Sequence, residues 1–498
     1  MIRINSIERT SNSRLINFPK QLNVLGQFLL FESLFLIVPL LVCLFKKEED
    51  WIPFLITACV TALSGFILKY LIKPSCDNLG RKDGCMITCM VWVIFSLYGM
   101  LPFIFGSAHL NISEGFFETM SGFTTTGATV IRDIENCSTG LVLWRAITQW
   151  IGGLGIVLFT LAIIPSLNSN KGVFMFHAEV SGITHDKIGA RIANTAKILW
   201  LLYGAMTVIL ILLLWIGPMN FFESVCHAFT AISTGGYSTR NESIAAFDSI
   251  YVKIILSVFM FLGGINFGLI YAACKGYLRQ LWKNDVFRAF LILISVNYIL
   301  TLVSILHSGN YKGWQSLTID PIFHIISSMT STGFGAANFE SWGALSIVLT
   351  IIMMYFGACA GSTTGGAKLD RLVYLFKNFK IEVKRSVSPR SMKAIRVNGQ
   401  IITPENTNEI IAFLLIYTCL IVLGGVLLAA MDFPIVDAFF SSISCISNNG
   451  LGSGITGVTG SYDFLPNIGK WVMSFLMLAG RLEIFALIML LTPSFWRR

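Results

Sequence analysis

The chain contains four versions of the stretch Thr124-Thr125-Thr126-Gly127-Ala128-Thr129. The other three are Ser233-Thr234-Gly235-Gly236-Tyr237-Ser238, Ser331-Thr332-Gly333-Phe334-Gly335 and Ser447-Asn448-Asn449-Gly450-Leu451-Gly452. Each version follows a short apolar run rich in Phe and precedes a polar stretch and a long apolar run. Self-similarity of this kind indicates a repeat architecture, and we expect the four unequal copies to surround one axis.

A glycine-containing Ser/Thr segment is suited to holding a dehydrated cation. Glycine adopts backbone conformations that aim successive carbonyl groups the same way, and a ring of carbonyls replaces the water shell of an ion. The alternative interpretation is that each segment is only a helix C-cap followed by a turn. Because the segment recurs four times between apolar spans, we predict one ion filter built around Gly127, Gly235, Gly333 and Gly450.

The composition is that of a polytopic membrane protein. Of the 498 residues, 54% are hydrophobic and 13% are charged, and the mean hydropathy is +0.71. These values exclude an ordinary soluble protein. The net charge of +9 does not indicate a nucleic-acid partner, because most basic residues fall in loops that we place on one side of the lipid bilayer.

Apolar windows predict an all-α fold with about ten transmembrane helices and four re-entrant half-helices around a pseudo-fourfold, channel-like pore. The spans are expected near 22–45, 51–72, 85–106, 141–165, 194–216, 250–274, 286–306, from 342, 408–431 and 467–491. Residues 1–84 then form a basic tail and a two-helix hairpin without a filter motif. The four pore repeats are 85–193, 194–285, 286–407 and 408–498.

Each repeat contains an apolar stretch too short to cross the membrane, which we interpret as a half-helix ending at the filter motif. Asn111 or Ser113 is the expected N-cap of the first, and Asp320-Pro321 is the expected start of the third. The C-terminal dipole ends of the four half-helices would favour a cation. Acidic residues recur within the half-helices and are expected to support them through hydrogen bonds: Glu118, Glu223 and Asp437.

Basic residues set the orientation. With both termini cytoplasmic, the inner segments are 1–20, 73–84, 166–193, 275–288, 368–407 and 492–498, and they hold most of the Lys and Arg. All four filter motifs then lie on the outer side. Irregular backbone at that depth is tolerated where it lines a watery cavity or is buried in protein.

The third return span is interrupted by glycines. Residues 357–368 contain Gly357, Gly361, Gly365 and Gly366 and end at Lys368, and each glycine weakens a helix by about 1 kcal/mol. We predict an unwound gating loop below the filter; a flexible helix kink is the alternative.

Arg481 lies within the fourth return span, where a buried cation is costly and usually functional. We predict that it sits on the pore axis below the filter and slows permeant cations. Snorkelling, or an ion pair at a subunit contact, is the alternative.

Trp144-Arg145-Ala146-Ile147-Thr148-Gln149-Trp150-Ile151-Gly152-Gly153-Leu154-Gly155-Ile156, together with the four filter motifs, resembles the Trk/Ktr/HKT superfamily of potassium transporters over nearly the whole chain. The hairpin and Asn448-Asn449-Gly450 are most similar to its bacterial TrkH/TrkG branch. Residues 357–368 and Gly480-Arg481-Leu482-Glu483 resemble that family's intramembrane gate and pore arginine.

The resemblance implies potassium uptake across the cell membrane (the inner membrane of a Gram-negative cell) by a homodimer in which each subunit has its own pore. It also implies a TrkA-like cytoplasmic regulatory subunit that binds NAD, ATP or ADP, with no cofactor in this chain. The implied potassium ligands are the only metal site: Thr125, Thr126, Gly127, Ser233, Thr234, Gly235, Ser331, Thr332, Gly333, Asn448, Asn449 and Gly450.

Several alternatives remain open at this point. Proton- or sodium-coupled symport would need an acidic relay that the sequence does not reveal. A second alternative is a less selective carrier of sodium or ammonium, although the four filter glycines favour potassium. A membrane enzyme is the alternative from a different class, but the sequence shows neither a nucleophile–base pairing nor metal-ligand spacing among its six histidines.

Overall fold

The computed structural model describes residues 17–72, 81–155, 192–311, 313–388, 396–398, 400–401, 404–457 and 460–496. Helices dominate this part of the chain, with one short antiparallel pair of strands, β1 (Arg396–Val397) and β2 (Gln400–Ile401). Four predicted segments lie largely outside the described residues: the basic tail up to residue 16, residues 73–80 of the inner segment 73–84, the end of the first return span, and nearly all of the inner segment 166–193.

The N-terminal hairpin consists of α1 (Phe18–Lys46) and α2 (Trp51–Phe66), which continues into a short π-helix, η1 (Ile67–Leu71). The two helices approach closely because Gly26 and Gly65 face one another. A Cβ on Gly26 would lie 2.8 Å from the carbonyl oxygen of Gly65, and a Cβ on Gly65 would lie 2.9 Å from that of Gly26. The hairpin packs on the first repeat through α1, which contacts α3 and α6.

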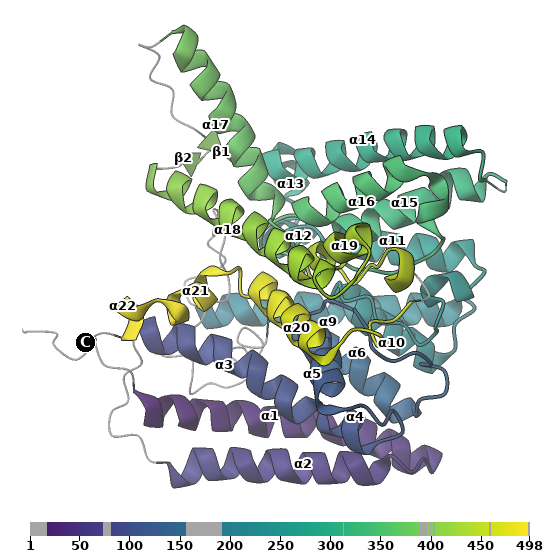
Figure 1. Ribbon diagram of the computed structural model, residues 1–498, viewed down its shortest axis with the longest axis vertical. Coiled ribbons are helices and arrows are strands. Elements are labelled where there is room, and N and C mark those ends of the chain that lie inside the picture. The colour runs from purple at the N-terminus through teal and green to yellow at the C-terminus, as the bar shows by residue number, and fades with distance from the viewer. Residues whose placement is uncertain are drawn as a thin grey trace, which may run out of the picture.

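Four helical repeats follow (Figure 1). Repeat one contains α3 (Arg81–Gly99), α4 (Leu101–Phe105), α5 (Ile112–Phe123) and α6 (Thr139–Gly153). Repeat two contains α9 (Ile192–Ile216), α10 (Phe221–Ile232), η3 (Ser243–Ala246), α11 (Ile250–Gly263), α12 (Phe267–Cys274) and α13 (Leu278–Lys283). Repeat three contains α14 (Asp285–Ser308), α15 (Gln315–Met329), η4 (Phe339–Trp342), α16 (Ala344–Phe356) and α17 (Leu369–Val387). Repeat four contains α18 (Pro404–Ala429), α19 (Ile435–Ile446), η5 (Gly454–Thr456), α20 (Asn467–Arg481), α21 (Phe485–Leu491) and α22 (Pro493–Trp496).

Six helices of the described chain are long and apolar enough to cross a membrane, and two bent pairs also qualify. The bent pairs are α11 with α12, at 106°, and α20 with α21, at 116°. The two other predicted return spans correspond to α6, whose continuation is not described, and to α16, which ends at Phe356. The polytopic helical architecture is therefore confirmed, whereas the layout of ten spans and four re-entrant segments stays a prediction.

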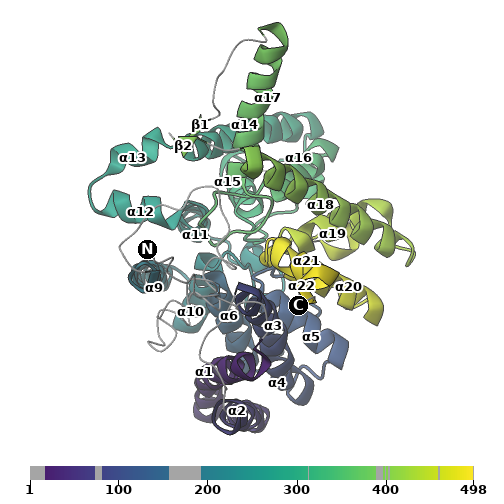
Figure 2. The same cartoon turned by 90° about the vertical axis from the view of Figure 1, so that its left-hand side faces the viewer.

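Half-helices and return helices form a closed circle. In order of contact they are α5, α6, α10, α11, α15, α16, α19 and α20, and α20 packs against α5 again. Figure 2 shows the repeats surrounding a centre, with α1 and α2, seen nearly end-on, at the periphery and α17 projecting from the body. The circle places the C-terminal ends of the four half-helices, α5, α10, α15 and α19, toward the middle.

The starts of the half-helices follow local rules, with one correction. Asn111 caps α5 as predicted: its side chain accepts a hydrogen bond from the Glu114 amide at 3.0 Å. The prediction for the third half-helix was wrong, because α15 begins at Gln315 and contains Pro321 in its interior. Proline cannot donate to the carbonyl group four residues earlier, and the Tyr298 hydroxyl donates to that carbonyl, of Leu317, at 3.3 Å.

Candidate functional site

The four motif segments share one backbone geometry. Each half-helix ends in a residue with a left-handed φ between 51° and 55°: Thr125, Thr234, Ser331 and Asn448. The next amide donates back into the helix at 2.8–3.0 Å, from Thr126, Gly235, Thr332 and Asn449. This is a Schellman-type helix end. Each motif therefore does contain a helix C-cap, as the alternative interpretation expected. The chain then continues into a second left-handed residue.

That second residue is a glycine in every repeat, with φ between 76° and 85°: Gly127, Gly236, Gly333 and Gly450. The predicted equivalence was therefore off by one residue in repeat two, where Gly236 rather than Gly235 takes this position. The sequence contains two adjacent glycines there, and only the place where α10 ends distinguishes them. The residue equivalent to Thr125 is accordingly Thr234 and not Ser233, which is the C-cap.

The four glycines close a ring. A Cβ on Gly127 would collide with the carbonyl oxygen of Gly235, one on Gly236 with that of Thr332, and one on Gly333 with that of Asn449. The ring closes because a Cβ on Gly450 would collide with the carbonyl oxygen of Thr126. Each repeat thus abuts the next through the same backbone carbonyl position, and only glycine fits at the contact. All four carbonyl groups belong to structurally equivalent residues.

Two cavities flank the ring. One, of about 70 Å³, is lined by the four ring glycines together with Thr129, Arg145 and Tyr237, and we call its side the mouth side. The other, of about 120 Å³, is lined by Asn448, Gly480, Arg481 and residues 361–366, and we call its side the loop side. The negative dipole ends of the half-helices also lie at the ring. A carbonyl ring between two cavities is chemically suited to a dehydrated cation.

Residues 357–368 lie directly against the loop side of the ring. The Gly365 amide donates to Ser331 Oγ at 2.6 Å, and a Cβ on Gly365 would collide with the carbonyl oxygen of Ser447. Thr363 Oγ1 lies 3.3 Å from Thr234 Oγ1. The loop therefore touches repeats two, three and four. Three of its glycines have left-handed φ values, namely Gly357, Gly361 and Gly366, which is why the helix unwinds here.

Arg481 ties the loop to repeat one. Its guanidinium donates to the carbonyl oxygen of Thr363 at 2.9 Å and to that of Gly153 at 2.9 Å, and it also donates to Gly152. It lines the loop-side cavity together with Asn448. The structure thus brings Arg481, the loop and the ring together, and loop and arginine jointly contact all four repeats.

The base of the loop is fixed by α17. Asp370 accepts a hydrogen bond from the Ala360 amide at 2.5 Å. Arg371 donates to the carbonyl oxygen of Ala367 at 3.0 Å and forms an ion pair with Glu483. Glu483 lies at the bend between α20 and α21 and has a left-handed φ of 51°. Lys368, at the end of the loop, donates to Thr364.

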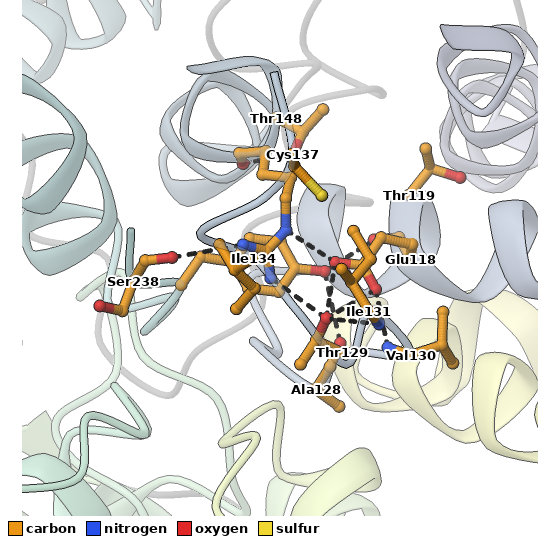
Figure 3. A network of polar contacts seen from close by, with 12 residues as sticks. Glu118, Thr119, Ala128, Thr129, Val130, Ile131, Ile134, Cys137, Thr148 and Ser238 are labelled. Carbon is orange, nitrogen blue, oxygen red and sulfur yellow. Dashed lines mark hydrogen bonds and ion pairs between the residues drawn. The ribbon is translucent and has the colours of Figure 1, made fainter. Parts of the chain in front are cut away.

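On the mouth side, Arg145 and Glu118 form a buried ion pair at 2.8 Å (Figure 3). Glu118 accepts from the Val130 amide at 2.9 Å, which holds the chain that leaves the first ring segment. Arg145 donates to the carbonyl oxygen of Ser238 at 3.3 Å, and its guanidinium lies 4.0 Å from the centre of the Tyr237 ring. The pair therefore joins the exits of ring segments one and two, and the predicted supporting role of Glu118 is confirmed.

The recurring acid of the half-helices is not Glu118, however. The equivalent positions, each nine residues before the end of its half-helix, are Glu114, Glu223, Asp320 and Asp437. Two of these pair with a lysine near the start of a return helix from the preceding repeat. Lys253 contacts Asp320 and Lys470 contacts Glu114, both at 2.8 Å, and both lysines are buried. Two of the four junctions between repeats are thus held by ion pairs of a buried lysine.

Sequence reasoning missed Gln149 as a site residue. Its side-chain nitrogen donates to the carbonyl oxygen of Gly235 at 2.6 Å, and its oxygen accepts from the Tyr237 amide at 3.1 Å. Gln149 thereby fixes both sides of the ring residue Gly236. The only available signal was its place in the Trp144–Ile156 stretch, which marked a resemblance without assigning a role.

Further out on the mouth side, the loops after ring segments one and two are joined by polar contacts. The Asn241 side chain accepts from the Ile134 amide at 2.8 Å and donates to Asp133 at 3.2 Å. The hydrogen bond from Asn241, with a further one from Asn136, holds the pKa of the Asp133 carboxyl below its usual range. Asp133 therefore stays ionised near the mouth.

A closed circle of half-helices and return helices around a carbonyl ring defines a multi-pass membrane protein of the cation-transport class. The chain belongs to the TrkH family of cation transport proteins, whose family model matches residues 53–497. It is 33% identical to the Trk system potassium uptake protein TrkH of Escherichia coli K12 over 479 residues, which cover 95% of this chain and 98% of that protein.

Two further relatives agree with this assignment. The Trk system potassium uptake protein TrkG of Escherichia coli K12 is 32% identical over 468 residues, covering 93% of this chain and 96% of that protein. The crystal structure of the potassium transporter TrkH from Vibrio parahaemolyticus superposes with a TM-score of 0.87 at 30% identity, covering 97% of this chain and 100% of that one. The resemblance predicted from the motifs is confirmed. These relatives are named as transport proteins, not as enzymes.

Proposed function

We propose that this protein takes up potassium through the ring formed by residues 125–127, 234–236, 331–333 and 448–450. The observation that carries the proposal is the ring closure, in which each glycine abuts the carbonyl group of the next repeat. The names of the relatives support potassium as the ion. The backbone carbonyl groups of these segments replace the hydration shell of the ion, and an inward potential contributes about 2.3 kcal/mol per charge for 100 mV.

The loop 357–368 and Arg481 act as the gate in this proposal. They lie across the loop side of the ring and contact all four repeats. An ion leaving the ring meets a fixed guanidinium, which raises the free energy of a cation in the loop-side cavity. The mouth side faces outward, and both termini are cytoplasmic, which agrees with the distribution of basic residues.

In this proposal the protein is a homodimer, and a cytoplasmic nucleotide-binding partner regulates it. The names of the relatives support a partner, because they describe these proteins as parts of a Trk system. The projecting helix α17 supports a protein contact on that side, because Phe376 and Phe379 are 70% and 67% exposed on it. The base of α17 holds the gate through Asp370 and Arg371, so movement of this helix would reach the loop.

The direct test is uptake of radioactive rubidium by proteoliposomes that contain only this chain. We expect potassium to compete strongly and sodium weakly. Equal competition by both ions would contradict a potassium filter. Absence of uptake from vesicles in which the protein is shown to be folded, even after the loop 357–368 is shortened, would contradict the pore itself.

A further inference from the structure

Glu32 lies in the middle of α1, on the helix face that packs against the first repeat. Phe28 precedes it by one turn and Leu36 follows it by one turn, and all three side chains are at most 1% exposed. Most buried side chains of α1 are apolar, with Gln21, Asn23 and Ser33 as the uncharged polar ones. Glu32 is the one acidic residue within α1 and α2, and neither the filter nor the gate accounts for it.

The surroundings of Glu32 are aromatic. A Cβ placed on Gly99 of α3 would lie 3.3 Å from Glu32 Oε1, 3.0 Å from the Phe123 ring and 3.4 Å from the Trp144 ring. Phe28, Phe95, Phe123 and Trp144 form a chain of edge-to-face contacts, with successive ring centres 5.5–6.3 Å apart. The carboxyl group therefore lies in an apolar pocket between α1, α3 and the end of α5.

Neither carboxyl oxygen of Glu32 has a hydrogen-bond partner among the described residues. The charged side chains on the elements around this pocket are engaged elsewhere: Asp50 with Ser107, Lys69 with Tyr70, Lys82 with the Phe495 carbonyl, Asp83 with Gln21, Glu114 with Lys470, and Arg145 with Glu118. On α1 itself, Lys20 and Lys46 lie about three or more turns away. The remaining titratable side chains of these elements are thiols and phenols, which carry no positive charge: Cys43, Cys59, Cys85, Cys89, Tyr70 and Tyr98.

An ionised carboxylate in such a pocket would be very costly, because it would lose its water without gaining a cation or a hydrogen-bond donor. Ionisable groups inside a membrane protein are rarely without a function. We propose that Glu32 is a proton-binding site: it carries a proton as a neutral carboxylic acid in this structure, and it releases that proton to water only when the α1–α2 hairpin separates from α3.

The site has a direct route to the ring. Phe123, which borders the pocket, is the last residue of α5, and the ring segment begins two residues later at Thr125. Separation of the hairpin would remove packing from Phe123 and so loosen the first ring segment. The inference goes beyond potassium uptake, because it assigns a proton-sensitive role to a hairpin that lies outside the four repeats.

Infrared difference spectroscopy tests the protonation state without any ion transport. We expect the wild-type protein in lipid at neutral pH to show the carbonyl stretch of a protonated carboxylic acid, and Glu32→Gln to lose it. The exposed Glu49 gives the control, because Glu49→Gln should remove only carboxylate absorption. If Glu32→Gln also removes only carboxylate absorption, Glu32 is ionised and the proposal is overturned.

Thermal unfolding of the full chain tests the link to the hairpin. Above about pH 4.3 an unfolded glutamate is ionised, so the native state binds one more proton and loses stability as pH rises. We expect the melting temperature of the wild type to fall with rising pH more steeply than that of Glu32→Gln, whereas Glu49→Gln keeps the wild-type slope. Equal slopes for the wild type and Glu32→Gln would overturn the proposal.

Glu32→Met guards against a trivial loss of folding. A neutral acid without partners can be replaced by an apolar side chain of similar volume, so we expect this variant to melt at or above the wild-type temperature at neutral pH. Strong destabilisation by Glu32→Met would instead show that an ionised Glu32 is needed in the fold. Both stability measurements remain informative even if the protein proves not to select potassium.

Discussion

Gly450 faces the carbonyl oxygen of Thr126 so closely that a Cβ on the glycine would collide with it, and this contact joins the fourth repeat to the first. Three similar contacts connect the other repeats. A substitution at any of the four glycines therefore displaces a carbonyl group that belongs to the neighbouring repeat. The ring is a shared structure, so the ion selectivity proposed for it would depend on all four segments.

Gly235 and Gly236 should differ when Gln149 is removed. The three atoms nearest to a Cβ on Gly235 all belong to the Gln149 side chain, whereas the atom nearest to a Cβ on Gly236 is the Thr332 carbonyl oxygen. In a Gln149→Ala background, Gly235→Ala should cause little further loss of rubidium uptake, and Gly236→Ala should still abolish most of it. Equal further losses in this double-mutant cycle would contradict the assignment of Gly236 to the ring.

Arg481→Ala should raise rubidium uptake by the chain alone. The guanidinium donates hydrogen bonds to carbonyl groups of the loop and of repeat one, and hydrogen bonds from a charged group contribute about 1.5–3 kcal/mol each. Loss of one such bond corresponds to a shift of roughly ten- to a hundredfold in the population of the displaced loop. Uptake by Arg481→Lys should lie between that of the wild type and that of Arg481→Ala. If Arg481→Ala takes up rubidium at the wild-type rate, this arginine is only structural.

Arg371 and Glu483 should behave as one latch. Their ion pair connects α17 to the bend of the fourth return helix, and both side chains are largely buried. Arg371→Glu and Glu483→Arg should each increase uptake without a partner, because each removes the contact that holds the loop base. The double variant, Arg371→Glu with Glu483→Arg, should restore a low rate of uptake without a partner. If the exchanged pair is as leaky as either single variant, the latch is absent.

Lys253→Met should destabilise the fold by about 3–5 kcal/mol, because it leaves Asp320 buried and unpaired between repeats two and three. Lys253→Met combined with Asp320→Leu should recover much of this loss. The exposed pair of Arg385 and Glu382 gives the control, where Arg385→Ala should cost at most about 1 kcal/mol. Thermal unfolding in detergent measures all three, and a small loss for Lys253→Met alone would contradict the role of this pair.

Much of the fold could be predicted from the sequence because local signals coincided with it. Apolar run length placed α1, α14 and α18 within a few residues, and the Asn111 cap fixed the start of α5. Pro321 misled because the carbonyl that it leaves unpaired is satisfied by Tyr298, a residue from another helix. A single-residue capping rule does not include such a tertiary hydrogen bond.

The site was predicted less completely, for a related reason. The motifs identify four glycine segments, but Gly235 and Gly236 differ only in which one abuts Thr332 of the next repeat. The same holds for the recurring acids. The equivalence of Glu114 and Asp320 can be recognised only when the half-helices are aligned by their C-terminal ends, which the sequence does not define. Glu32 gave no sequence signal, because a lone acid in an apolar run does not reveal whether a partner faces it.

Selection of potassium by the ring is tested by comparing the wild type with Gly127→Ser in rubidium uptake by proteoliposomes, with potassium and sodium as competitors. A Cβ at this position would collide with the carbonyl oxygen of Gly235 and distort the ring. We predict strong competition by potassium alone in the wild type, and much stronger competition by sodium in the variant. The same competition profile in both proteins, at comparable uptake, would show that the ring does not select the ion.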